Sequence, residues 1–139
     1  MTRICFVCRG NICRSPTCEA MLKQKACHAY RPELEIESRG INGQHNGEAP
    51  DPKMVASALV QGYSVTGISK ELTLRDLEKF DAFVALDHHV FGKLSKYTQG
   101  PSIIWMRNVL DPYGGTKSDY ESAVRQCESL CDEIWDFLC

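Results

Sequence analysis

Short apolar runs alternate along the chain with segments whose apolar residues have helical spacing. Residues 3–7 (Arg-Ile-Cys-Phe-Val) are almost continuously apolar, which is typical of a strand buried on both faces of a parallel sheet, so we expect this strand at the centre. Apolar and polar residues alternate over residues 34–38, which predicts a strand nearer the sheet edge. Residues 81–86 and 102–106 complete a predicted set of four strands.

Helical spacing predicts helices over residues 18–29, 88–97 and 119–138. Two shorter helices are also expected. One is marked by apolar residues at positions 55, 59 and 60, has a capped start at Asp51-Pro52 and stops at Gly62. The other opens at Thr73-Leu-Arg-Asp76, which resembles a capping box, and ends before residue 80. In the last helix the predicted buried face contains Tyr120, Val124, Cys127, Leu130, Ile134 and Phe137.

Strands that alternate with helices favour a doubly wound, three-layer α/β fold: a four-stranded, mainly parallel sheet flanked by helices, with right-handed crossovers. The length of 139 residues fits one domain, residues 1–139, with a substantial core. Residues 40–52 contain three glycines and two prolines, too many for regular structure. Ligands of such sheets bind at the carboxyl ends of the strands, so we expect the functional site there.

Composition narrows the class of protein. The net charge of −2 gives no sign of a nucleic-acid surface, and no segment has the length of a membrane span or the apolar core of a signal peptide. A cytoplasmic location is therefore expected, with the eight cysteines as reduced thiols. No histidine has metal-ligand spacing. A zinc site formed by the first four cysteines is disfavoured, because two of them would lie on a strand and a helix.

The segment Cys-Arg-Gly-Asn-Ile-Cys-Arg-Ser-Pro, residues 8–16, lies between the first predicted strand and the first helix. Five residues separate Cys8 from Arg14, and their backbone N–H groups can converge on one point at the helix N-terminus, where an anion is expected. The same donors and the Arg14 guanidinium stabilise the thiolate form of Cys8. A thiolate is a nucleophile, so this loop predicts covalent chemistry on an anionic substrate.

Each residue type in this loop suits a physical role. Gly10 permits close approach of the backbone to a bound group, and Asn11 tolerates the left-handed conformation that turns N–H groups inward. Arg14 offers a fork that fits two phosphate oxygens. Ser15 has two alternative roles: it caps the helix, or its hydroxyl donates a hydrogen bond to the sulfur of Cys8 and assists its departure.

Residues 7–16, Val-Cys-x-Gly-Asn-Ile-Cys-Arg-Ser-Pro, resemble the signature of the low-molecular-weight protein tyrosine phosphatase family. The resemblance implies hydrolysis of phosphotyrosine in proteins or of small aryl phosphates through a phosphocysteine, with inorganic phosphate as product and no metal or other cofactor. It implies a catalytic role for Cys8 and Arg14. Substrate or phosphate binding is implied for Arg9, Gly10, Asn11, Ile12, Cys13 and Ser15. A monomer is expected.

Expulsion of an alkoxide or phenoxide requires a proton, so the cysteine loop needs a carboxylic acid as partner. Asp111-Pro-Tyr-Gly-Gly, residues 111–115, supplies one after a predicted strand. Pro112 restricts Asp111 to an extended backbone, and Tyr113 can lie against the ring of an aryl phosphate. In the family that the chain resembles, an Asp-Pro followed by an aromatic residue is the general-acid loop, which makes Asp111 the expected acid.

Some positions depart from the family pattern. The loop expected to form one wall of the cleft contains Gln44 and His45 where many members have an aromatic residue, so the grip on a phosphotyrosine ring is expected to be weaker. Gly67 and Lys70 stand where relatives often have a histidine and an arginine, and Val90 stands where asparagine is frequent. The histidine often supports the asparagine of the phosphate loop, so a different support, lower activity or another substrate is expected.

Alternative functions remain open. Arsenate reductases of this fold need a further cysteine pair near the middle of the chain, but no cysteine lies between Cys27 and Cys127. Protein-arginine phosphatases favour threonine where this chain has Ile12. A redox-responsive module that binds phosphotyrosine without turnover is a third alternative. Related phosphatases also suggest a reversible, protective Cys8–Cys13 disulfide, although Cys13 is equally explained as a buried packing residue.

Overall fold

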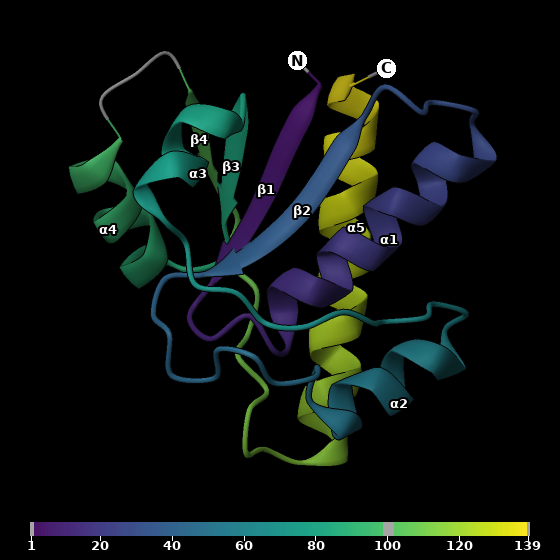
Figure 1. Ribbon diagram of the computed structural model, residues 1–139. Coiled ribbons are helices and arrows are strands. Elements are labelled where there is room, and N and C mark those ends of the chain that lie inside the picture. The colour runs from purple at the N-terminus through teal and green to yellow at the C-terminus, as the bar shows by residue number, and fades with distance from the viewer. Residues whose placement is uncertain (1, 99–101, 139) are drawn as a thin grey trace.

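Four parallel strands form a sheet in the order β2-β1-β3-β4 (Figure 1). This computed structural model describes residues 2–98 and 102–138. The strands are β1 (Arg3–Cys8), β2 (Glu35–Gly40), β3 (Ala82–Ala85) and β4 (Ile103–Met106). The helices are α1 (Arg14–His28), α2 (Pro52–Val60), α3 (Leu74–Lys79), α4 (His88–Tyr97) and α5 (Lys117–Leu138). The predicted α/β fold is confirmed.

Helices cover both faces of the sheet. α1, α2 and α5 pack together on one face, and α3 and α4 lie on the other (Figure 1). β1 contributes to both cores, with Ile4 and Phe6 in the first and Cys5 and Val7 in the second, all fully buried. The three layers and the central position of β1 agree with the prediction from its unbroken apolar run.

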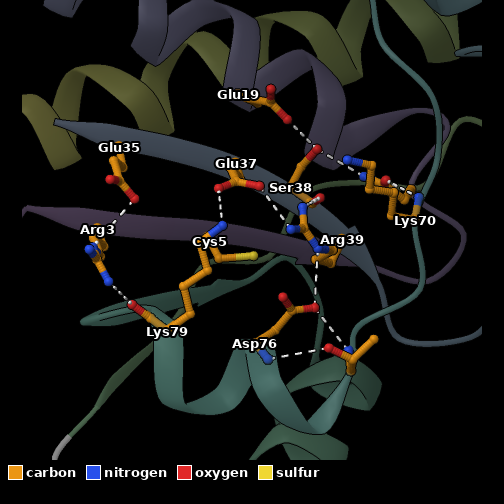
Figure 2. A network of polar contacts seen from close by, with 12 residues as sticks. Arg3, Cys5, Glu19, Glu35, Glu37, Ser38, Arg39, Lys70, Asp76 and Lys79 are labelled. Atoms are coloured by element: carbon orange, nitrogen blue, oxygen red, sulfur yellow. Dashed lines mark hydrogen bonds and ion pairs between the residues drawn. The ribbon is translucent and has the colours of Figure 1, made fainter. Parts of the chain in front are cut away.

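β2 is an edge strand, as predicted, but its polar residues are not all exposed. Ser38 and Arg39 are buried at the end of the strand that reaches the phosphate loop. Figure 2 shows Arg39 between Glu37 and Asp76, to which it donates hydrogen bonds of 2.8 and 3.2 Å. Charge pairing with β2 and α3 residues permits the burial of Arg39. The alternation of apolar and polar residues could not predict these partners of Arg39, because one of them, Asp76, belongs to a distant helix.

Two predicted helix starts are confirmed. Asp51 precedes α2, and its carboxylate accepts a hydrogen bond of 2.8 Å from the Lys53 N–H. Thr73 and Asp76 form a reciprocal capping box at the start of α3. Both caps satisfy backbone donors that a helix leaves free in its first turn, so these short helices have defined starts.

Two other helices begin earlier than predicted. α1 begins at Arg14 rather than Cys18, because Arg14 and the polar residues after it are buried by contacts of the site and do not follow apolar spacing. α5 begins at Lys117. Thr116 and Asp119 exchange hydrogen bonds of 2.9 and 3.2 Å, which stabilise this earlier start.

The predicted inner face of α5 is correct except at its end. The buried members are Tyr120, Val124, Cys127, Leu130 and Ile134. The prediction for Phe137 was wrong: its side chain is 65% exposed, and its ring packs edge-on against Trp105 of β4 at 4.9 Å between centroids. α5 extends past the core at this point, so helical spacing continues where there is no interior left to fill. Among residues 2–98 and 102–138, no helix combines the length and apolar character needed to cross a bilayer.

Candidate active site

The phosphate loop leads from the carboxyl end of β1 into the first turn of α1. Cys8 is the last residue of β1 and is 2% exposed. Its Sγ lies 2.9 Å from the Ser15 hydroxyl and accepts a hydrogen bond of 3.3 Å from the Asn11 N–H. This contact is the one that the second of the two predicted roles of Ser15 requires. Ser15 does not cap α1, since Cys13 occupies the cap position without a side-chain hydrogen bond.

Asn11 holds the loop in shape from within. It has a φ of 60°, the left-handed conformation expected from the sequence. Its side-chain amide donates to the hydroxyls of Ser15 and Ser38 at 2.8 and 2.9 Å, and its carbonyl accepts from the Lys70 N–H at 2.9 Å. Because Ser15 accepts from Asn11, its own hydrogen can be donated either to the Cys8 sulfur at 2.9 Å or to the Arg39 carbonyl at 3.5 Å.

Ser38 of β2 links this arrangement to α1. It donates a hydrogen bond of 2.5 Å to Glu19, and Figure 2 shows Glu19, Ser38 and Lys70 along the same chain of contacts. A different support for the phosphate-loop asparagine was expected because Gly67 replaces a frequent histidine. The structure supplies Ser38 and the Lys70 backbone, two groups that the sequence analysis did not name as part of the site.

Arg14, at the end of the loop, is only 2% exposed. Its Nη1 donates to the Asp87 carboxylate at 3.0 Å and to the carbonyls of Leu86 and Val109 at 3.4 and 3.1 Å. Its Nη2 lies 3.7 Å from the Asp111 carboxylate. Although burial alone would lower it, Cys8 and the two nearby carboxylates raise the pKa of Arg14, so the guanidinium stays charged.

Asp87 is a site residue that sequence reasoning missed. Its carboxylate accepts from Arg14 at 3.0 Å, from Arg9 at 3.2 Å and from the Val90 N–H at 2.8 Å, which caps α4. Burial acts to raise the pKa of Asp87, but the hydrogen bonds from Val90 and the arginines outweigh it and lower the pKa. A signal was present, because Asp87 directly follows a predicted strand and precedes a predicted helix, at the carboxyl edge of the sheet.

The loop with the predicted acid lies at the surface. Asp111 and Tyr113 are exposed, whereas Pro112 between them is buried. Asp111 accepts a hydrogen bond of 3.2 Å from the Tyr113 N–H and faces Arg14 with its other carboxylate oxygen. Gly114 has a φ of 76°, which favours glycine. The structure thus brings Asp111 to the phosphate loop that contains Cys8 and Arg14, from a distant part of the chain.

Of the two residues predicted to form the cleft wall, His45 lies between the phosphate loop and the acid loop. Its ring packs edge-on against Tyr113, with 5.4 Å between centroids, and its Nδ1 lies 3.0 Å from Glu48. The His45 ring also covers Gly10, where an added Cβ would lie 2.8 Å from it. The absence of a side chain at Gly10 therefore leaves room for the His45 ring. Gln44 is exposed.

Cys13, the second cysteine of the phosphate loop, contacts Asp51 at the start of α2. Cys13 Sγ donates to the Asp51 carboxylate at 3.7 Å, and the Tyr120 hydroxyl donates to the same oxygen at 2.8 Å. Burial and the Asp51 carboxylate raise the pKa of Cys13 and bring that of Tyr120 to about 12. The neighbouring Ile12 is buried, and its carbonyl accepts from the Asp51 N–H at 2.8 Å. Cys8 and Cys13 are both free thiols here.

Residues 3–138 match the family model described as low molecular weight phosphotyrosine protein phosphatase. The chain belongs to this family. Low molecular weight phosphatases are cysteine-dependent enzymes, in agreement with the resemblance seen in the phosphate loop. Among described residues 2–98 and 102–138, no group of three or more histidine, cysteine or acidic side chains has a metal-binding arrangement.

Individual relatives span nearly the whole chain. The low molecular weight protein-tyrosine-phosphatase PtpB of Staphylococcus aureus is 31% identical, with 99% of both chains covered. A putative low molecular weight protein-tyrosine-phosphatase of Synechocystis is 28% identical over 95% of this chain and 93% of its own. The crystal structure of a protein tyrosine phosphatase from Entamoeba histolytica with Hepes in the active site has a TM-score of 0.92 and 26% identity, covering 99% of this chain and 97% of its own.

Proposed function

We propose that this low molecular weight phosphatase hydrolyses phosphotyrosine in proteins, and small aryl phosphates, through a phosphocysteine. The observation that carries the proposal is the convergence of a buried Cys8 sulfur, a buried Arg14 guanidinium and the Asp111 carboxylate, with Asp111 3.7 Å from Arg14. Nucleophile, anion receptor and acid are the three groups that this reaction requires. The names of the relatives support the same substrate class.

In the first step the Cys8 thiolate attacks phosphorus. The new P–S bond forms as the P–O bond to the tyrosine breaks, and Asp111 gives its proton to the leaving oxygen. Arg14 and the loop N–H groups stabilise the negative charge on the other phosphoryl oxygens. We expect Tyr113 and His45, whose ring centroids lie 5.4 Å apart, to contact the aromatic ring of the substrate.

In the second step water attacks the phosphocysteine. Asp111, now ionised, takes a proton from the water, the P–S bond breaks and inorganic phosphate leaves. The Ser15 hydroxyl, 2.9 Å from the sulfur, stabilises the departing thiolate by donating a hydrogen bond. No step requires a metal. A reduced Cys8 is required throughout, which fits the expected cytoplasmic location. We expect the enzyme to act as a monomer.

The proposal is tested by measuring phosphate release from p-nitrophenyl phosphate, a phosphotyrosine peptide and a phosphoarginine peptide by the reduced protein at mildly acidic pH. We expect turnover of the first two and little of the third. Faster hydrolysis of phosphoarginine would replace the assignment by a protein-arginine phosphatase. Tight binding of the phosphotyrosine peptide without any phosphate release would instead identify a binding module.

The Cys8–Cys13 disulfide stays a prediction. To form it, peroxide would first oxidise the Cys8 thiolate to a sulfenic acid, and Cys13 would then attack that sulfur with loss of water. The carboxylate of Asp51, 3.7 Å from the Cys13 sulfur, is placed to accept the Cys13 proton. If Cys13→Ser recovers from peroxide under added thiol as fully as the parent protein, Cys13 has no protective role.

A further inference from the structure

Two arginines of the phosphate loop share one carboxylate oxygen but differ in exposure. Arg9 Nε and Arg14 Nη1 lie 3.2 and 3.0 Å from the same Oδ2 of Asp87. The Arg14 side chain is 2% exposed, whereas that of Arg9 is 54% exposed. Arg14 is therefore enclosed within the site, and Arg9 reaches solvent beside it. The mechanism described above uses Arg14 and gives Arg9 no task.

The contacts of this cluster leave part of the Arg9 guanidinium unused. Arg14 has two carboxylates within reach, Asp87 at 3.0 Å and Asp111 at 3.7 Å, whereas the Arg9 side chain pairs with Asp87 alone in the described part of the chain. Within residues 2–98 and 102–138, the ion pair and hydrogen bond of the Arg9 side chain involve only its Nε. Its two Nη atoms take no part in them, and a planar pair of N–H donors is the arrangement that binds a carboxylate with two parallel hydrogen bonds.

The position of Arg9 places this charge at the rim of the site. Arg9 directly follows the nucleophile, and its carbonyl accepts a hydrogen bond of 3.1 Å from the N–H of Asn42, on the loop that forms the cleft wall. On the other side, Asp87 connects Arg9 to the N-terminus of α4, where His88 and His89 are exposed. When a phosphoryl group occupies the loop, we expect residues adjoining the phosphotyrosine to lie near Arg9.

We propose that Arg9 is a specificity residue that favours phosphotyrosine followed or preceded by a glutamate or aspartate. This inference rests on the proposed function and names the sequence context that the same site prefers. The Asp87 carboxylate fixes the Arg9 guanidinium through Nε, which reduces the entropy lost when a second carboxylate binds. An ion pair at a half-exposed side chain is modest in strength, so the expected preference is about three- to fivefold in kcat/KM.

A pair of matched peptides tests this. One carries glutamate on both sides of the phosphotyrosine and the other carries glutamine, which has nearly the same shape without the charge. We expect the parent enzyme to prefer the glutamate peptide about three- to fivefold, chiefly through a lower KM, and the preference to shrink as salt is raised from about 50 to about 500 mM. In Arg9→Gln the ratio between the two peptides should fall to about one.

Arg75→Gln is the matched control. It removes the same charge from an exposed side chain on α3, away from the phosphate loop, and should keep the preference of the parent enzyme. An intermediate ratio in Arg9→Lys would fit the loss of two-point binding with the charge kept.

Three results overturn the inference. Equal losses on both peptides in Arg9→Gln, with the ratio preserved, would mean that Arg9 only holds Asp87 and Arg14 in place. A preference that vanishes equally in Arg75→Gln would reflect overall charge. If the parent enzyme has the same kcat/KM for the glutamine and glutamate peptides, it has no such preference, although its activity still supports the proposed function. Failure to turn over either peptide or p-nitrophenyl phosphate would remove the proposed function itself.

Discussion

The two loops of the site, residues 8–15 and 111–115, are constructed in opposite ways. In the phosphate loop every residue from Asn11 to Ser15 is buried, and the side chains of Ser38 and Asp87 hold it by hydrogen bonds. In the acid loop Asp111 and Tyr113 are exposed, and Asp111 makes one local hydrogen bond and one contact to Arg14 at 3.7 Å. One loop is part of the core and the other lies on the surface.

This difference matches the tasks that we propose for them. Stabilising the charge of a transition state requires donors that are already in position, because any reorganisation during the reaction raises the barrier. A general acid that later acts as base must exchange a proton with a leaving oxygen and then with water, so access to solvent is needed. The comparison leads to four predictions, given below from the largest expected effect to the smallest.

Cys8→Ser should lower the turnover of p-nitrophenyl phosphate by about 10⁴-fold or more, because a serine hydroxyl without a general base is a poor nucleophile. Phosphate binding should persist, since Arg14 and the loop N–H groups remain. Steady-state kinetics measure the first effect, and titration with inorganic phosphate followed by NMR measures the second. Residual activity within about tenfold of the parent would remove Cys8 from its role as nucleophile.

Asp111→Asn should slow hydrolysis by about 100-fold for phenyl phosphate, whose leaving group needs a proton, and by much less for p-nitrophenyl phosphate. The measurement is kcat for a series of aryl phosphates with leaving groups of different basicity. Asp119→Asn, an exchange near the start of α5 outside the catalytic set, is the control. The same loss for every leaving group would show that Asp111 is not the acid.

The loops should also differ in their effect on stability. Asn11→Ala removes two buried donor bonds and the acceptor for the Lys70 N–H, and places alanine at a φ of 60°, so we expect the free energy of unfolding to fall by about 2 kcal/mol. Asp111→Asn should change it by less than about 0.5 kcal/mol. Urea unfolding measures both. Equal effects would contradict the contrast between a core loop and a surface loop.

The smallest effect is expected for the pH dependence due to Asp87. Because its pKa is lowered in the folded state, Asp87 stabilises the protein above its unfolded pKa of about 3.9, and this contribution is lost as the pH falls through the folded pKa. In Asp87→Asn the amide oxygen can still accept from Arg14, so we expect a loss of about 1 kcal/mol at pH 7. Urea unfolding from pH 7 to about pH 3 should show the two proteins converge; a constant difference would refute this role.

Much of the fold and of the site was predictable from local sequence. The apolar run before Cys8 located the central strand, Asp51 and the pair Thr73 and Asp76 marked helix starts, and the residues between Cys8 and Arg14 defined the phosphate loop. These features depend on interactions within a few residues, such as capping, strand burial and backbone conformation, so the order of residue types is sufficient to identify them.

Only the tertiary structure decided what depends on distant segments. Local pattern placed Phe137 in the core, because the pattern does not record where the core ends, and it gave no sign that Arg39 is buried between two carboxylates. The choice of Ser15 as partner of the Cys8 sulfur, the support of Asn11 by Ser38, and Asp87 between two arginines likewise required the assembled sheet. The amino-acid sequence by itself determined the reactive groups. The order of the parallel strands brought the carboxyl ends of these strands together, and this determined the partners of each reactive group.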